Sequence, residues 1–187
     1  MAPSQAKSSE KQTILVLGDS LSAGYNIPLE KGWVNLLRQK LQKDNPEVKV
    51  INASVSGDTT GQGLARLKPL LEEHQPDLVI LELGGNDGLR GIAPPLIKRN
   101  LQSMIEMAKS SGAKVLLLGI QILPNYGKRY TEAFEQNYQE LAAENNIDLI
   151  PFFLKGVGGN DELMQKDGIH PNEQAQPILL NNILVKW

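Results

Sequence analysis

The sequence predicts an α/β protein in which a five-stranded parallel sheet lies between two layers of helices. From residue 13 onward, short apolar runs alternate with segments whose apolar residues recur at helical spacing. The apolar runs lack polar alternation, which is typical of parallel strands buried on both faces. Right-handed crossovers leave few topologies. We expect the flavodoxin-like strand order 2-1-3-4-5 in a three-layer α/β/α arrangement, with a switch point between the first and third strands.

The first half of this pattern contains three strands and two helices. The first strand starts at residue 13 and contains an uninterrupted apolar run over residues 14–17 that Gly18 ends. Residues 48–52 and 77–83 form the second and third strands. Between the first two strands, a helix that stops at Asn45-Pro46 is indicated by Trp33, Leu36, Leu37 and Leu41. Between the second and third strands, residues 63–73 form a helix with one leucine-rich face.

The second half repeats the alternation. Pro94 and Pro95 open a long helix that stops at Gly112, and residues 114–120 follow as the fourth strand. Residues 130–145 form the next helix, and residues 147–151 form the fifth strand. We expect Pro171 to begin a last helix, restarted at Pro177, that runs towards Trp187.

Length and composition limit the possible classes of function. The 187 residues fit one domain, and 19 Lys and Arg against 21 Asp and Glu give a net charge of −2. This balance argues against a nucleic-acid partner, since phosphate binding requires a basic surface. No apolar run is long enough for a membrane span. The chain has no cysteine, which excludes disulfides and thiolate zinc sites.

The first twelve residues differ from the rest of the chain. Residues 1–12 are polar and aperiodic, so we expect a disordered arm followed by a single domain over residues 13–187. This arm has no apolar core of a signal peptide. The sequence is therefore consistent either with a cytoplasmic protein or with an exported one whose signal peptide has been replaced by a start Met.

Polar groups follow four of the five strands. They are Asp19-Ser20 after the first, residues 52–58 after the second, residues 84–87 after the third and residues 167–171 after the fifth. Because the carboxyl ends of parallel strands meet at one edge of a sheet, we expect these groups to lie together. A Ser there is a candidate nucleophile, although Ser20 alone also fits a helix cap. A hydroxyl, an imidazole, a carboxylate and oxyanion donors are the parts that acyl transfer requires.

Four blocks in this order resemble the SGNH (GDSL-type) hydrolase family: Gly18-Asp-Ser20-Leu-Ser22, Gly57, Gly85-Asn86-Asp87 and Asp167-x-x-His170. Residues 55–58, 82–91 and 125–127 are similar to the bacterial thioesterase, lysophospholipase and arylesterase subgroup. The resemblance implies hydrolysis of carboxylic esters and thioesters such as aryl esters, acyl-CoA and lysophospholipids. It also implies a periplasmic or secreted monomer without a metal or other cofactor.

The predicted catalytic residues and oxyanion donors each have a role in acyl transfer. We expect His170 to take the proton of Ser20, because a hydroxyl is a weak nucleophile without a base. Asp167 lies three residues before His170 and can fix its tautomer and stabilise the imidazolium. We expect the oxyanion to be stabilised by the backbone N–H groups of Ser20 and Gly57 and by the side-chain amide of Asn86.

Substrate contacts are expected from loops at the same edge. An apolar groove for an acyl chain is predicted from Leu21, Tyr25, Ile122, Leu123, Pro124, Tyr126 and Phe152. Phe152 and Phe153 fit the hydrophobic core equally well. The glycines form neither G-x-G-x-x-G nor a P-loop, so no nucleotide cofactor is expected.

Two alternatives remain open at this point. One is a carbohydrate acetylesterase of the same family, which would require more aromatic or polar side chains around Ser20. The other is a flavodoxin-like binding module without catalysis. A receiver-type module would carry an acidic cluster and a lysine at the strand ends, where this chain has Asp167, His170 and Asn86.

Overall fold

The parallel sheet predicted from the sequence is present. The computed structural model describes residues 10–187, apart from the side chain of Pro124. The five strands are β1 (Gln12–Gly18), β2 (Val48–Asn52), β3 (Leu78–Glu82), β4 (Lys114–Leu118) and β5 (Asp148–Ile150). They are all parallel, in the order β2-β1-β3-β4-β5. In register, Val16 of β1 lies between Asn52 of β2 and Ile80 of β3, which puts β1 inside the sheet.

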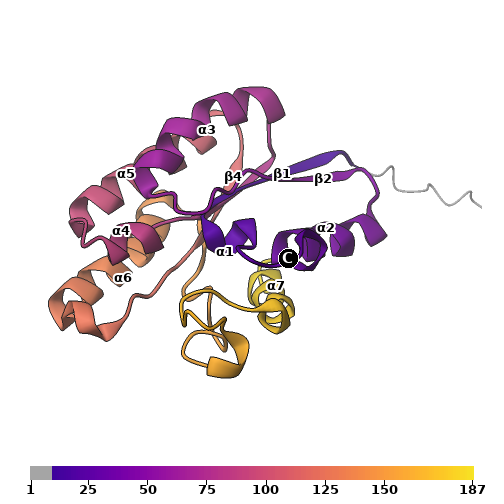
Figure 1. Cartoon of the computed structure of the whole chain (residues 1–187). Helices are drawn as coiled ribbons and strands as arrows, with labels where there is room; N and C mark the ends of the chain where they lie inside the picture. The colour runs from indigo at the N-terminus through magenta and orange to yellow at the C-terminus, as the bar shows by residue number, and fades with distance from the viewer. Residues whose placement is uncertain (1–9) are drawn as a thin grey trace, which may run out of the picture.

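Helices cover both faces of this sheet. They are α1 (Ser20–Ala23), α2 (Trp33–Asp44), α3 (Thr60–His74), α4 (Gly85–Leu89), α5 (Pro94–Ser110), α6 (Lys128–Asn145) and α7 (Gln176–Leu184). Helix α5 packs between α3 and α6 on one face, and α2 packs against α7 on the other (Figure 1). The short helices α1 and α4 belong to neither layer, because they follow directly from the ends of β1 and β3.

The core is built on β1. The side chains of residues 14–17 are completely buried, in the way that an uninterrupted apolar strand predicts. Trp33 of α2 covers one face of the sheet, while Leu67 of α3 and Met104 of α5 are buried in the other helical layer. Burial of each large apolar side chain contributes about 1.5–3 kcal/mol. The strand that leads into Ser20 is therefore held firmly in place.

The end of the chain differs from the sequence-based expectation. Pro171 does not begin the last helix, because it forms an antiparallel bridge with Met164. The side chain of Asn172 then accepts a hydrogen bond from the N–H of Ala175, which caps a 3₁₀ turn at Glu173–Ala175. Helix α7 follows and ends at Leu184. Its Pro177 lies in the first turn, where no N–H is needed.

The start of the chain differs by one residue. Gln12 already belongs to β1 and pairs with Val48, so the ordered domain begins before residue 13. Residues 1–9, which make up most of the expected arm, lie outside the described residues.

Candidate active site

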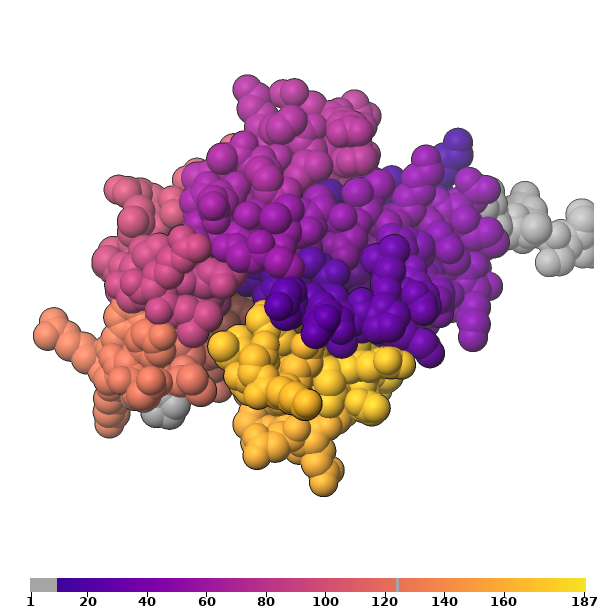
Figure 2. Space-filling model, in the orientation of Figure 1, coloured from indigo at the N-terminus to yellow at the C-terminus, as the bar shows by residue number. Residues whose placement is uncertain are grey.

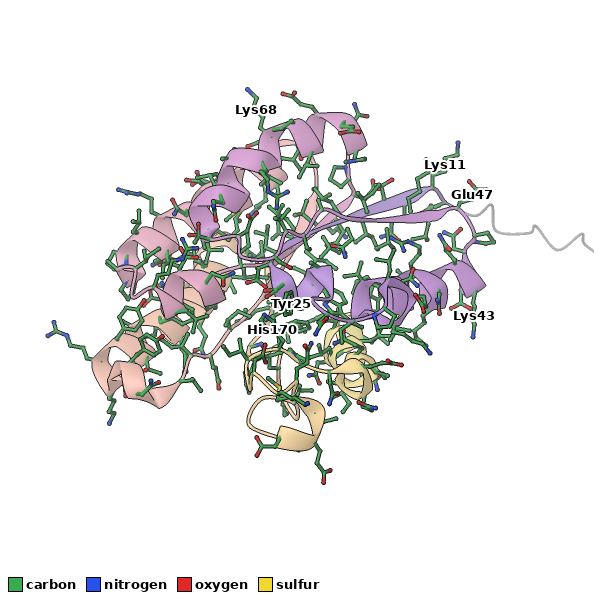
Figure 3. All side chains as sticks on the ribbon, viewed as in Figure 1. Lys11, Tyr25, Lys43, Glu47, Lys68 and His170 are labelled. Atoms are coloured by element: carbon green, nitrogen blue, oxygen red, sulfur yellow. The ribbon has the colours of Figure 1, made fainter. Side chains whose placement is uncertain are left out.

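The carboxyl ends of β1 and β3 supply the first part of the site. Ser20 opens α1 immediately after β1, and Asn86 lies in the first turn of α4 after β3. The loop after β5 brings His170 to the same place, where Figure 3 shows it beside Tyr25 and below α1. Residues 150 positions apart in the sequence, Ser20 and His170, are thereby in direct contact.

Two consecutive hydrogen bonds connect the three predicted catalytic residues. Nε2 of His170 lies 3.0 Å from Oγ of Ser20. Nδ1 of the same ring lies 2.6 Å from Oδ2 of Asp167. The carboxylate accepts the Nδ1 proton, so Nε2 is left free to accept the proton of the Ser20 hydroxyl.

The local sequence builds a tight loop around Asp167 and His170. Oδ1 of Asp167 accepts hydrogen bonds from the backbone N–H groups of Ile169 at 2.9 Å and His170 at 3.0 Å. Gly168 has φ +67°, a backbone conformation that favours glycine. The hydrogen bond from the His170 side chain, followed by the two backbone donors, lowers the pKa of Asp167 to about 2. Asp167 is therefore ionised at neutral pH.

The three predicted oxyanion donors lie on the segments that follow β1, β2 and β3. Gly57 lies in the loop after β2 with φ +88°, and a Cβ added there would contact no other atom within 4 Å. Among the described residues, no acceptor is hydrogen-bonded to the backbone N–H of Gly57 or of Ser20. The Asn86 amide donates to the carbonyl of Asp58 at 2.9 Å and, weakly, to Oδ2 of Asp19 at 3.5 Å. One bond holds the amide in place while its second hydrogen is only loosely held.

A mostly apolar cavity of about 350 Å³ opens beside Ser20 and His170. In Figure 2 the indigo, magenta and yellow segments meet around a hollow on the face shown. The apolar side chains that line the cavity come from the loops after β1, β3, β4 and β5: Leu21, Leu89, Ile120, Ile122, Leu123, Phe152, Leu154, Met164 and Ile169.

The predicted substrate residues fall into two groups. The structure places Leu21, Ile122, Leu123 and Phe152 in the cavity wall, whereas Phe153 is buried in the core against Trp33.

Tyr25 and Tyr126 are not among the residues that line the cavity. Tyr25 lies on the other side of His170, with ring centroids 4.4 Å apart. Tyr126 donates its hydroxyl to the carbonyl of Leu89 at 3.0 Å, which holds the loop instead of facing the cavity. Pro124 begins a 3₁₀ turn (Pro124–Tyr126), and its side chain lies outside the described structure.

Comparison with known proteins shows which family the chain belongs to. Residues 16–177 match the GDSL-like Lipase/Acylhydrolase family. The chain belongs to this family. The match spans all four sequence blocks at the sheet edge, and it confirms the resemblance drawn from them.

Individual relatives of this GDSL-like hydrolase are named as esterases. The chain is 55% identical to Esterase TesA of Pseudomonas aeruginosa, over 92% of this chain and 86% of the relative. It is 48% identical to Thioesterase 1/protease 1/lysophospholipase L1 of Escherichia coli K12, over 89% and 79%. The crystal structure of the psychrotrophic esterase EstA from Pseudoalteromonas is 40% identical and superimposes with a TM-score of 0.88, covering 93% of this chain and 95% of that one. The protein is therefore an ester hydrolase and not a non-catalytic binding module.

Beneath the site of this GDSL-like hydrolase lies a buried pair of carboxyl groups. Glu82, at the end of β3, is fully buried and accepts a hydrogen bond from the hydroxyl of Ser22 at 2.6 Å. Its Oε1 also lies 3.4 Å from the backbone N of Asp19, and its Oε2 has no partner among the described residues. Burial raises the pKa of Asp19 to about 6. Burial, together with the charge of Asp19, raises the pKa of Glu82 well above its usual range.

Other acidic residues near the site have structural contacts. Asp58 does not cap α3, because Thr59 does so in a capping box with Gln62. The carboxylate of Asp58 instead pairs with Arg66 at 2.8 Å. Asp87 accepts hydrogen bonds from the N–H and the hydroxyl of Thr60, at 2.8 and 2.7 Å.

Sequence reasoning missed two polar residues of the site. Glu82 could have been found, because it is the single charged residue within an otherwise apolar run of a central strand, and such a residue needs a buried partner. Gln165 gives no comparable signal, since the contact that gives it a role is with Tyr25, which lies 140 residues away. The lining residues Leu89, Met164 and Ile169 were missed because they lie in short turns and bridges without periodicity.

Residues 10–187 contain no cluster of three or more His, Asp or Glu side chains with the arrangement of a metal site. No helix within that range has the length and apolar character needed to cross a bilayer.

Proposed function

We propose that the protein hydrolyses carboxylic esters and thioesters through an acyl-enzyme on Ser20, with a Ser20–His170–Asp167 triad. The observation that carries the proposal is the pair of hydrogen bonds that joins the three side chains at the mouth of an apolar cavity. The lowered pKa of Asp167 supports it, because an ionised carboxylate can stabilise a transient imidazolium.

The reaction follows from the two nitrogens of His170. Nε2 takes the Ser20 proton while Oγ attacks the acyl carbon, and Asp167 stabilises the imidazolium through Nδ1. As the tetrahedral intermediate collapses, the bond to the alcohol or thiol breaks and Nε2 returns the proton to that leaving group. A water molecule then gives a proton to Nε2 while its oxygen attacks the acyl carbon. The bond between Oγ of Ser20 and the acyl carbon breaks, Nε2 returns the proton to Oγ, and the acid leaves with the Ser20 hydroxyl restored.

The negative oxygen of the intermediate faces three donors in this proposal. They are the N–H groups of Ser20 and Gly57 and the amide of Asn86. Two features support the assignment: the backbone donors have no protein acceptor among the described residues, and the open space at Gly57 lets a substrate approach its backbone.

The cavity favours substrates with an apolar acyl chain. Its wall is formed mainly by aliphatic side chains, and its polar groups are concentrated around Ser20 and His170. This composition fits aryl esters, acyl-CoA and lysophospholipids better than a carbohydrate acetyl ester, which would expose a polar sugar to this wall. The relative from Escherichia coli is named as both a thioesterase and a lysophospholipase.

Phosphonate labelling tests the acyl-enzyme. The structure of EstA is described as inhibited by monoethylphosphonate. We expect a p-nitrophenyl phosphonate to modify this chain at Ser20, and Ser20→Ala to remain folded but lose labelling and turnover. Ser56→Ala, an exposed serine of the loop after β2, is the matched control and should keep both. Labelling at Ser22, Ser54 or Ser56 would contradict the proposal.

A substrate panel tests the specificity. We expect turnover of a short p-nitrophenyl ester, palmitoyl-CoA and a lysophospholipid, all abolished by Ser20→Ala. An enzyme that cleaves acetylated sugars and none of these three would instead be a carbohydrate esterase.

We also propose a periplasmic or secreted monomer, as the resemblance to the bacterial subgroup implies. Immunoblotting of periplasmic, culture-medium and cytoplasmic fractions from the native bacterium tests the location. Light scattering during gel filtration tests the mass, for which a monomer of this chain predicts 20.5 kDa.

A further inference from the structure

The loop that carries Asp167 and His170 fixes these two residues relative to each other but not relative to Ser20. Its internal contacts are the bridge between Met164 and Pro171 and the hydrogen bonds to the Asp167 carboxylate. Ser20 belongs to a different segment, at the end of β1. Proton transfer requires Nε2 within hydrogen-bond reach of Oγ, so other contacts must set the distance between the two segments.

Gln165 makes the polar contacts between these segments. Its Nε2 donates to the carbonyl of Tyr25 at 2.9 Å and to the carbonyl of Pro171 at 3.0 Å. Its backbone N–H donates to the carbonyl of His170 at 2.7 Å. One side chain thus joins the segment after Ser20 to the residue that follows His170.

Tyr25 completes the connection on the other side. Its backbone N–H donates to the carbonyl of Ser20 at 3.1 Å, while its carbonyl accepts from Gln165. Its ring lies against the imidazole of His170, next to which Figure 3 shows it. The ring centroids are 4.4 Å apart and the interplanar angle is 38°. The ring therefore blocks rotation of the imidazole away from Ser20 on that side.

We propose that Gln165 and Tyr25 are positioning residues that together set the distance between Nε2 of His170 and Oγ of Ser20. This inference rests on the proposed triad. Gln165 fixes the loop to the segment that follows Ser20, and the Tyr25 ring holds the imidazole in the rotamer that faces Ser20. Neither residue touches the reacting atoms, and both act through His170.

Four variants separate these contributions. Gln165→Met keeps the length of the side chain but removes the amide donor. Tyr25→Leu removes the ring, and Tyr25→Phe keeps it; the backbone carbonyl that accepts from Gln165 remains in all of them. Gln174→Ala is the matched control, because Gln174 is an exposed glutamine that lines a surface groove together with Tyr25 and Gln165.

We expect Gln165→Met and Tyr25→Leu each to lower kcat by up to about 10²-fold with KM unchanged, because a displacement of about 1 Å costs this much. Phosphonate modification of Ser20 should slow by the same factor. The acid limb of the kcat/KM profile should stay in place, since Asp167 still pairs with His170 inside the loop. Tyr25→Phe should regain most of the activity that Tyr25→Leu loses, and Gln174→Ala should match the wild type.

The double variant tests whether the two residues act on one distance. The combined loss in Gln165→Met/Tyr25→Leu should be smaller than the product of the single losses. Wild-type kcat in both single variants, or losses that appear in KM alone, would overturn the proposal. So would a loss that only follows the unfolded fraction, measured by thermal melting at the assay temperature. If the triad itself were wrong, Ser20→Ala would retain turnover, an outcome distinct from all of these.

Discussion

At the scale of single residues, the two ring nitrogens of His170 have different partners and different roles. Nδ1 is held by a carboxylate at 2.6 Å, and Nε2 faces a hydroxyl at 3.0 Å. The carboxylate contributes through its charge and its fixed position, because two backbone N–H groups hold the oxygen that does not contact the ring. An asparagine at 167 would keep much of this geometry but lose the charge.

We therefore expect Asp167→Asn to fold normally and to lose roughly 10⁴-fold in kcat, as the same change does in other triads. The acid limb of its kcat/KM profile should move to lower pH, because the imidazolium loses the carboxylate that stabilises it. Steady-state kinetics between pH 4 and pH 9 measure both effects. Retained activity with an unmoved acid limb would make Asp167 a structural turn residue.

Asn86 provides a second test at this scale. If its amide stabilises the oxyanion, Asn86→Ala should lower kcat by about 10²–10³-fold with little change in KM. Asn182→Ala, on α7, serves as the control, because that amide donates to the carbonyls of Phe153 and Lys155. A near-normal kcat in Asn86→Ala would show that Asn86 only donates a hydrogen bond to the carbonyl of Asp58 and does not stabilise the oxyanion.

At the scale of elements, the short helix α4 is held in place by the start of α3. The buried carboxylate of Asp87 accepts two hydrogen bonds from Thr60, whose hydroxyl also accepts one from Asn100 of α5. Three helices therefore meet at one polar point, next to Asn86.

We expect Asp87→Ala to lower the free energy of unfolding by about 1–3 kcal/mol, because it leaves the buried N–H of Thr60 without an acceptor. It should also reduce kcat, since α4 carries Asn86. Urea unfolding and steady-state kinetics measure the two effects, with the exposed Asp161→Ala as the control. Unchanged stability in Asp87→Ala would show that water replaces the carboxylate.

At the scale of the whole molecule, the buried carboxyl pair makes stability depend on pH. The pKa of Asp19 is raised from 3.8 to about 6 in the folded protein. The contribution of Asp19 to the free energy of unfolding is therefore complete below pH 4 and is lost as the pH rises to about 6. This difference corresponds to about 3 kcal/mol. Glu82, whose pKa is also raised, acts in the same direction. Asp167 has the opposite effect on the pH dependence of stability. Because its pKa is lowered, its carboxylate stabilises the folded protein at neutral pH, and this stabilisation is lost as the pH falls from 4 towards 2.

A variant of Glu82 isolates this effect. Glu82→Gln keeps an acceptor for Ser22, adds a donor that can face Asp19 and removes one buried charge. We expect its free energy of unfolding to fall less between pH 4 and pH 7 than that of the wild type, measured with urea at both values. Glu82→Leu, which leaves the Ser22 hydroxyl unpartnered, should be destabilised at both. An equal fall in Glu82→Gln and the wild type would contradict the role of the pair.

The sequence by itself determined the sheet, its strand order and the edge at which the chemistry gathers. Buried parallel strands appear as apolar runs, and the handedness of their crossovers leaves few arrangements. Local motifs such as Asp167-x-x-His170 were readable because their partners lie within one loop.

Only the tertiary structure decided which side chains meet across loops. Phe152 lines the cavity while its neighbour Phe153 enters the core, although periodicity treats the two residues alike. Pro171 bridges Met164 instead of opening a helix. The contacts of Gln165 with Tyr25 and of Glu82 with Ser22 join segments that lie 140 and 60 residues apart. Such contacts depend on how the loops pack after the sheet has formed, and no local pattern in the sequence encodes that packing.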